Sequence, residues 1–236
     1  MQATVCLPTY NERENVERMV RALVDRGVRV LVVDDNSPDG TGEIADRLAA
    51  ELDVVDVIHR ERKEGLGPAY LAGFRRALAE GAELILEMDC DFSHDPEDVP
   101  RLIAGAEEAD LVLGSRYVRG GRIPNWSFLR RFISRGGCVY AQLWLQTRLR
   151  DLTGGFKCYR REVLETIDLD AIDSKGYAFQ IEGTYRTLRK GFRIVEMPIT
   201  FVDRKQGHSK MSGAIVLEAI WRVPVLAALG LAGRLR

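Results

Sequence analysis

A chain of 236 residues, 46% hydrophobic and 29% charged, can bury the core of one α/β domain spanning residues 1–236. Its formal net charge of -1 gives no overall basic field, which argues against nucleic acid as a partner. The four cysteines contain no CxxC pair, so neither a zinc site nor a disulfide framework is expected, and a reducing cytoplasm suits them.

Strand-like and helix-like segments alternate through the first half of the chain. Short apolar runs predict strands, and apolar residues that recur at helical spacing predict helices between them. This alternation predicts a mostly parallel central sheet flanked by helices, with right-handed crossovers and a ligand site at the carboxyl ends of the strands. The expected strands are 3–7, 28–33, 54–58, 84–88 and 111–113, and the expected helices lie around 16–24, 44–52, 69–78 and 99–106.

Two carboxylates separated by one residue, Asp89 and Asp91, follow the apolar run at 84–88. Hard oxygen ligands just past a strand suit a divalent cation held against a phosphorylated ligand, although short Asp-x-Asp strings also occur in solvated loops and helix caps. Asp95 and Pro96 then form a typical helix start, as N-cap and first helical residue. The sequence therefore places both carboxylates in a short strand-to-helix turn.

Beyond residue 118 the alternation stops. The composition of 119–124 is typical of a mobile loop that can close over a ligand. A helix predicted at 128–145 places Arg130 and Ser134 on one face, where a solvated basic surface is the ordinary alternative to a phosphate site. The apolar segment 215–232 has an uninterrupted part too short to span a bilayer, which leaves core packing and a membrane interface both open.

A series of motifs along almost the whole chain resembles the dolichol-phosphate and polyprenol-phosphate mannose synthases of glycosyltransferase family 2. The most specific of them lie in 134–136, 152–154 and 204–210, because the wider family shares the earlier ones. The resemblance implies a GT-A fold, a GDP-mannose donor, Mg²⁺ or Mn²⁺, and a polyprenyl or dolichyl phosphate acceptor. The motifs are 8–15, 34–41, 65–70, 89–94, 114–117, 133–136, 151–156 and 201–211.

Carried over position by position, the resemblance divides the chain into a nucleotide-sugar and metal half, 1–117, and an acceptor-side and membrane-proximal half, 118–236. It implies a metal site at Asp89 and Asp91 and an acceptor-phosphate site at Arg130 and Ser134. The implied catalytic residues are Asp91, Arg116, Arg204 and Lys210. The implied nucleotide-sugar contacts are Pro8, Tyr10, Glu12, Val33, Asp35, Asp89, Cys90, Asp91, Arg116, Arg204 and Lys210.

Several of these residues have an ordinary structural alternative. Core or turn packing is the alternative for Pro8 and Val33, and a surface salt bridge is the alternative for each cation. Two positions depart from the family pattern. Cys90 stands where alanine is more usual, and Glu87 stands where an apolar residue is usual, so that Glu87 is expected either to face solvent or to add negative charge near the metal.

The resemblance implies inverting transfer of mannose to the lipid phosphate, which is already anionic and needs positioning more than deprotonation. A related transferase that uses UDP-glucose or another sugar nucleotide remains open. A non-catalytic scaffold is the more distant alternative, against which the retained charged residues argue. We expect a peripheral location at the cytoplasmic face of a membrane, and a membrane-spanning partner stays open. The residues expected to meet the lipid surface are Trp126, Trp144 and Trp221, with Arg130, Arg131, Arg135 and Arg222 at the head groups.

Overall fold

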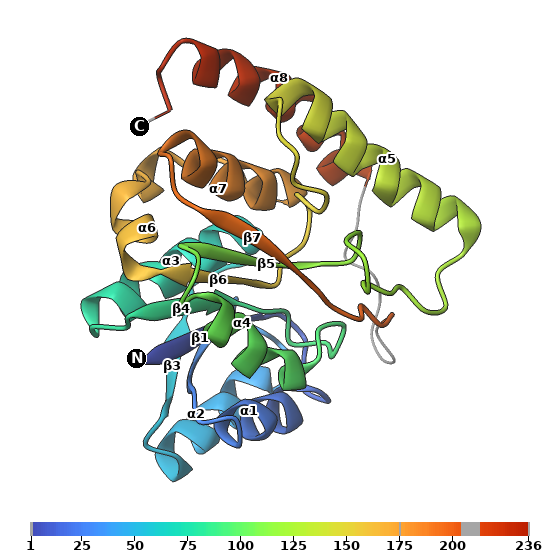
Figure 1. Cartoon of the computed structure of the whole chain (residues 1–236). Helices are drawn as coiled ribbons and strands as arrows, with labels where there is room; N and C mark the ends of the chain where they lie inside the picture. The colour runs from blue at the N-terminus through green and yellow to red at the C-terminus, as the bar shows by residue number, and fades with distance from the viewer. Residues whose placement is uncertain (1, 175, 204–212, 236) are drawn as a thin grey trace.

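The computed structural model describes residues 2–174, 176–203 and 213–235. Within these residues the chain forms one seven-stranded sheet in the order β3-β2-β1-β4-β6-β5-β7 (Figure 1). The strands are β1 (Ala3–Thr9), β2 (Arg29–Asp34), β3 (Val55–His59), β4 (Leu84–Glu87), β5 (Leu111–Ser115), β6 (Lys157–Arg160) and β7 (Ile194–Pro198). The α-helices are α1 (Val16–Val24), α2 (Thr41–Glu51), α3 (Leu66–Ala79), α4 (Val99–Gly105), α5 (Phe128–Leu145), α6 (Arg161–Thr166), α7 (Tyr177–Arg189) and α8 (Gly213–Leu231).

The sheet is mixed, with a single strand reversed among the described residues. β1 to β4 pair in parallel, as do β5 and β7, whereas β6 runs antiparallel between β4 and β5. The predicted mostly parallel α/β sheet is therefore confirmed. Strands β6 and β7 were missed, because the helix-strand alternation breaks before them and their segments are short.

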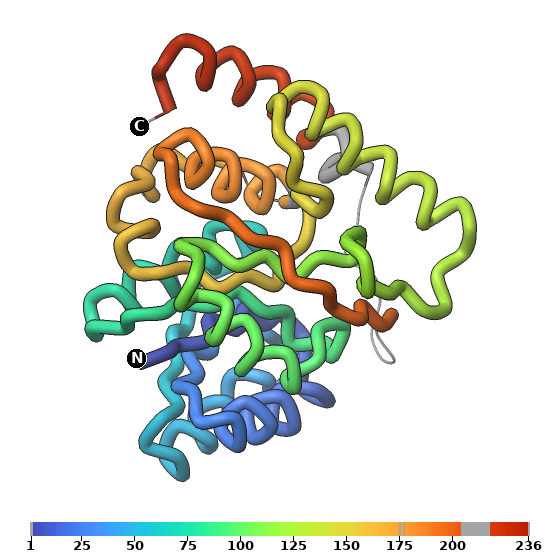
Figure 2. Tube along the Cα trace, in the orientation of Figure 1, coloured from blue at the N-terminus to red at the C-terminus, as the bar shows by residue number. Residues whose placement is uncertain are grey.

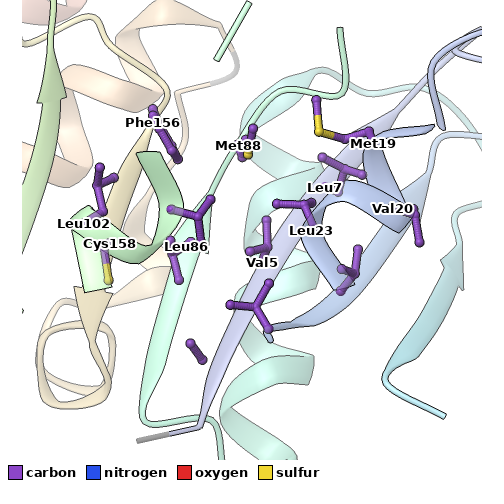
Figure 3. Close-up of a cluster of buried hydrophobic side chains, with 14 of the residues drawn as sticks. Val5, Leu7, Met19, Val20, Leu23, Leu86, Met88, Leu102, Phe156 and Cys158 are labelled. Carbon is purple, nitrogen blue, oxygen red and sulfur yellow. The ribbon is translucent and has the colours of Figure 1, made fainter. Parts of the chain in front are cut away.

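Two apolar layers sandwich the sheet, because successive residues of a buried strand point to opposite faces. Helices α1, α2 and α4 cover one face, where Val5 and Leu7 of β1 pack with Leu23 of α1 (Figure 3). Helices α3, α6 and α7 cover the other face, on which Cys6 of β1 lies. All four cysteines are buried free thiols.

Helices α5 and α8 form an additional layer that packs on α7 rather than on the sheet (Figures 1 and 2). Leu145 of α5, Tyr185 of α7 and Leu226 of α8 are buried together in a cluster of their own. The expected helix at 128–145 is confirmed in its bounds. Because only one side of α5 is covered, most of its large apolar side chains remain exposed.

The loop expected to be mobile is tied to the chain that follows β7. The backbone N–H of Arg122 donates to the carbonyl of Ile199 at 3.0 Å, and Phe201 N–H donates to the carbonyl of Arg122 at 2.9 Å. Arg122 and Thr200 thereby form a parallel bridge. These bonds hold 119–124 against the segment that leads toward residue 204.

Candidate active site

The candidate site lies at the carboxyl end of the sheet, where β1 lies between β2 and β4. The chain leaves β1 in one direction to form β2 and β3, and β4 lies on the opposite side, which makes this point a topological switch. Strand β1 reaches Thr9 and β2 reaches Asp34, so Pro8 and Thr9 lie within a strand rather than after it. The turn that follows β4 carries Asp89 and Asp91.

The Asp89 to Asp91 turn is fixed by buried neighbours. Tyr70 Oη donates to Asp89 Oδ1 at 3.4 Å, and burial raises the pKa of this phenol well above its ordinary value, so it keeps its proton. Asp91 Oδ1 accepts from the backbone N–H of Ser93 at 3.0 Å. Asp95 accepts from Glu97 N–H, which confirms the predicted cap before Pro96.

The two carboxylates suit a hard divalent cation whose remaining coordination positions are filled by oxygens of a bound ligand. Within the described residues no three His, Cys, Asp or Glu side chains gather closely enough to hold a metal alone. Asp89 and Asp91 contribute carboxylate oxygens, which Mg²⁺ and Mn²⁺ prefer. A site with few protein ligands is typical of Mg²⁺ bound with substrate phosphates.

The first two strand ends carry the residues assigned to the nucleotide. Arg60 Nη1 donates to Asp35 Oδ1 at 2.5 Å, while partial burial raises the pKa of Asp35 against the opposing charge of Arg60. Lys63 Nζ lies 4.0 Å from the Tyr10 ring centroid. Glu12 accepts from Asn15 Nδ2 at 2.9 Å. Asp35 and Tyr10 therefore flank one edge of the sheet, each with a cation beside it that sequence reasoning missed.

Three residues assigned to the nucleotide have other contacts in the structure. Val33 is fully buried in the layer on the α3 side, so its side chain is a core residue. The Cys90 side chain belongs to the opposite core. Pro8 is half-buried within β1. For Val33 and Cys90, only backbone atoms remain to approach a nucleotide.

Arg116 is held in a buried ion pair with Asp151. Its Nε and Nη2 donate to the two carboxylate oxygens at 2.7 and 2.6 Å, and Nη2 also donates to Thr153 Oγ1 at 2.8 Å. Burial alone would raise the pKa of Asp151, but the charge and hydrogen bonds of Arg116 hold it below its ordinary value. The motif at 151–156 was noticed in the sequence, but its pairing with Arg116 was not.

Arg116 also lines an open cleft of about 540 Å³ together with Arg122 and Arg131. Nearby, Arg130 pairs with Asp203 at 2.5 Å and stacks 4.2 Å from the Trp126 ring. On the next turn of α5, Ser134 Oγ accepts from Tyr117 Oη at 2.7 Å. The part of the site formed by residues after 115 therefore carries several arginine side chains and the hydroxyl groups of Tyr117 and Ser134.

Arg204 and Lys210 lie outside the described residues. The chain that leads to them is placed, because Val202 N–H donates to the Ser93 carbonyl at 3.1 Å. Phe201 packs edge-on against His94, with ring centroids 5.4 Å apart. The segment that carries Arg204 therefore starts beside the turn of Asp91.

Glu87 corrects the sequence expectation most clearly. It does not face solvent: it is fully buried on β4, opposite Lys157 of the antiparallel strand β6. Lys157 Nζ lies 3.9 Å from Glu87 Oε2. Burial raises the pKa of Glu87 and lowers that of Lys157, while the opposite charge of each acts against this shift.

A sheet with this switch point and a carboxylate pair at its β4 end matches the GT-A class of nucleotide-sugar transferases. The family model for Glycosyl transferase family 2 matches residues 4–168. The chain therefore belongs to glycosyl transferase family 2, and the predicted resemblance is confirmed.

Three mannosyltransferases resemble the chain over more than nine tenths of its length. The chain is 52% identical to an undecaprenyl-phosphate mannosyltransferase of Micrococcus luteus, covering 94% of this chain and 93% of the relative. It is 50% identical to a polyprenol monophosphomannose synthase of Mycolicibacterium smegmatis, covering 98% and 88%. A dolichol-phosphate mannosyltransferase of Pyrococcus furiosus is 37% identical, covering 92% of this chain and 61% of the relative.

The fold is shared with a solved structure of low sequence identity. Glucosyl-3-phosphoglycerate synthase from Mycobacterium tuberculosis, in complex with Mn²⁺, UDP-glucose and phosphoglyceric acid, superposes with a TM-score of 0.72 at 18% identity. The superposition covers 96% of this chain and 80% of that one. This likeness confirms the predicted fold.

Proposed function

We propose that this chain transfers mannose from GDP-mannose to a polyprenyl phosphate, with inversion at the anomeric carbon. The observation that carries the proposal is the 52% identity to an undecaprenyl-phosphate mannosyltransferase over 94% of the chain. The geometry supports it, because carboxylates, a half-buried tyrosine and arginines converge at one end of the sheet. Donor and acceptor phosphates both need such cationic surroundings.

Asp89 and Asp91 would hold Mg²⁺ or Mn²⁺ against the donor diphosphate. When bound, the ion neutralises the negative charge that develops on the leaving phosphate. Asp35 and Tyr10 would bind the nucleoside, through hydrogen bonds to the carboxylate and stacking on the ring. Arg204 and Lys210 would add positive charge at the diphosphate, since their segment starts beside the Asp91 turn.

Arg130 and Ser134 would bind the acceptor phosphate. Ser134 accepts its hydrogen bond from Tyr117, so its own hydroxyl proton remains to be donated to a phosphate oxygen. The phosphate would compete with Asp203 for Arg130, and Arg122 and Arg131 line the adjacent cleft. A phosphate that is anionic at neutral pH attacks without a dedicated base, so these residues orient it rather than take its proton.

The donor assignment predicts which nucleotide stabilises the protein. With Mg²⁺ or Mn²⁺ present, GDP-mannose at about 100 times its Kd should raise the free energy of unfolding by about 2.7 kcal/mol. UDP-glucose at the same concentration should give a much smaller rise in melting temperature. A larger shift with UDP-glucose than with GDP-mannose would move the donor assignment to the alternative sugar nucleotide.

The exposed surface of α5 and α8 would bring the site to its lipid substrate. No helix within 2–174, 176–203 or 213–235 is long and apolar enough to cross a membrane. Arg131 and Arg135 flank the apolar residues of α5 and suit anionic head groups. The exposed large apolar residues of the two helices are Phe128, Leu129, Phe132, Ile133, Val139, Leu143, Trp144, Ile220, Trp221, Val225 and Leu231.

One part of the membrane expectation is wrong. Arg222 does not point to lipid head groups, because its Nη2 lies 3.2 Å from Glu182 Oε2 and its Nε donates to Ser174 Oγ at 3.1 Å. Glu182 is fully buried on α7. Arg222 therefore fixes α8 to α7, and Trp221 on the neighbouring face of α8 remains exposed.

This surface predicts peripheral, salt-sensitive binding to liposomes that contain anionic lipid. Phe132→Glu and Trp221→Glu should each weaken binding by about tenfold or more, because each removes an inserted aromatic ring and adds a negative charge. Gln2→Glu adds the same charge at an exposed position just before β1, outside α5 and α8, and this variant should bind like wild type. Co-sedimentation at low and high salt measures this, and wild-type binding by both α5 and α8 variants would contradict it.

A further inference from the structure

The arginine assigned to the acceptor phosphate is already paired with a carboxylate of the same chain. Arg130 Nη1 donates to Asp203 Oδ2 at 2.5 Å. Each of the two side chains is 39% exposed, so water reaches the ion pair and another anion can replace the carboxylate. A carboxylate and a phosphate accept the same kind of charged hydrogen bond from a guanidinium. Asp203 therefore occupies Arg130 in the way that an acceptor phosphate would.

The Arg130 guanidinium has a second support that does not depend on this carboxylate. Its central carbon lies 4.2 Å from the centroid of the Trp126 ring, where the face of the ring attracts a cation. Trp126 in turn packs edge-on against Phe201, with ring centroids 5.6 Å apart. The indole ring therefore holds the guanidinium in place whichever anion binds it.

The Asp203 carboxylate is tethered close to the cation. The backbone N–H groups of Phe201 and Val202 donate to the carbonyls of Arg122 and Ser93, at 2.9 and 3.1 Å. Asp203 follows these two fixed residues directly, so its carboxylate stays within reach of the guanidinium after an anion has displaced it. A group on a short tether acts at an effective concentration on the order of millimolar. The tethered carboxylate can therefore compete with an anion that arrives from outside.

The charge of the lipid phosphate changes during the proposed reaction. A phosphate monoester carries about 1.5 to 2 negative charges at neutral pH, because its second pKa is about 6. After transfer one of its oxygens is bonded to the sugar, and the diester product carries a single negative charge. The monoester therefore attracts Arg130 more strongly than Asp203 does, whereas the product has only the charge of Asp203 and lacks its tether.

We propose that Asp203 is an internal competitor for the acceptor phosphate. Its carboxylate occupies Arg130 until a phosphate monoester displaces it, and it returns to Arg130 when the reaction leaves a diester, which promotes release of the product. This rests on the proposed function. The competition lowers the affinity of the site for every anion, so that singly charged anions of the surroundings leave Arg130 free for the acceptor.

Asp203→Asn tests this, because it keeps an oxygen beside Arg130 and removes the competing charge. In calorimetry without donor, the Kd of a short polyprenyl phosphate should fall by about threefold to fivefold, the range that an exposed ion pair allows. The inhibition constant of the mannosylated lipid product should fall by a similar factor. A carboxylate that merely positioned Arg130 would give a higher Kd in this variant, and a higher or unchanged Kd would overturn the proposal.

A double-variant cycle shows whether the effect passes through Arg130. The measured quantity is kcat/KM for the acceptor, which can be determined below saturation. Asp203→Asn should raise it by about threefold to fivefold in the wild-type background and leave it unchanged in the Arg130→Met background, where no cation remains to be occupied. An equal rise in both backgrounds would contradict the proposal, because it would show a general effect of the lost negative charge.

Asp170→Asn is the matched control. It removes a carboxylate from another exposed ion pair, with Arg75, outside the candidate site. Its Kd for the short polyprenyl phosphate should equal that of wild type. Failure of the proposed function would appear in the wild-type protein, as no mannosyl transfer from GDP-mannose, whereas failure of the competition leaves wild-type transfer intact and appears only in the Asp203→Asn variants.

Discussion

Asp91→Asn should lower the rate of mannosyl transfer by about 10³-fold at saturating metal. The substitution removes a charged oxygen that the divalent cation requires and leaves the developing diphosphate charge less well stabilised. The fold should be retained, because an asparagine oxygen can still accept from Ser93 N–H. The measurement is the rate of product formation, with the melting temperature as a check on folding.

Asp95→Asn is the matched control for this prediction. Asp95 lies four residues along the same turn, is exposed, and caps the following helix through an oxygen that asparagine also supplies. Its activity should stay within about twofold of wild type. Wild-type activity of Asp91→Asn in metal-free buffer would remove Asp91 from the site.

Asp151→Asn should destabilise the fold by about 3–5 kcal/mol, because it leaves the Arg116 guanidinium buried without its opposite charge. Arg116 and Asp151 have side chains only 7% and 0% exposed. Urea unfolding of Asp151→Asn, Arg116→Met and the double variant measures the coupling, and the double variant should lose less than the two single losses added together. Additive losses would show that the pair does not act as a unit.

Arg75→Met gives the surface comparison, since Arg75 pairs with Asp170 at 2.5 Å where both side chains are at least half exposed. That pair should contribute no more than about 1 kcal/mol.

The buried ion pair of Arg116 and Asp151 also predicts how stability depends on pH. The pKa of Asp151 in the folded chain lies below its unfolded value, so its contribution is present at neutral pH and is lost as pH falls below about 4.

The strand-to-helix pattern of the first half could be predicted because each strand there is a continuous apolar run with a polar turn after it. Asp89, Asp35 and Tyr10 follow such strands, so their grouping at one edge follows from parallel pairing alone. The carboxylate turn and its Asp95 cap were predicted correctly for this reason.

The second half could not be predicted in the same way, because its key contacts join distant segments. Glu87 and Lys157 meet only because β6 is antiparallel to β4, and no local pattern marks that pairing. Arg222 carries no signal that its partner is Glu182 on another helix. Long-range ion pairs depend on topology, whereas a strand or helix depends on neighbouring residues.

The most direct measurement of the central claim is a transfer assay with purified protein, a divalent metal, a short polyprenyl phosphate and either GDP-mannose or UDP-glucose. The product should form from GDP-mannose and carry a β-linked mannosyl phosphate, as read from the anomeric proton and carbon by NMR. Transfer from UDP-glucose alone, an α-linked product, or no lipid product from either donor would contradict the account.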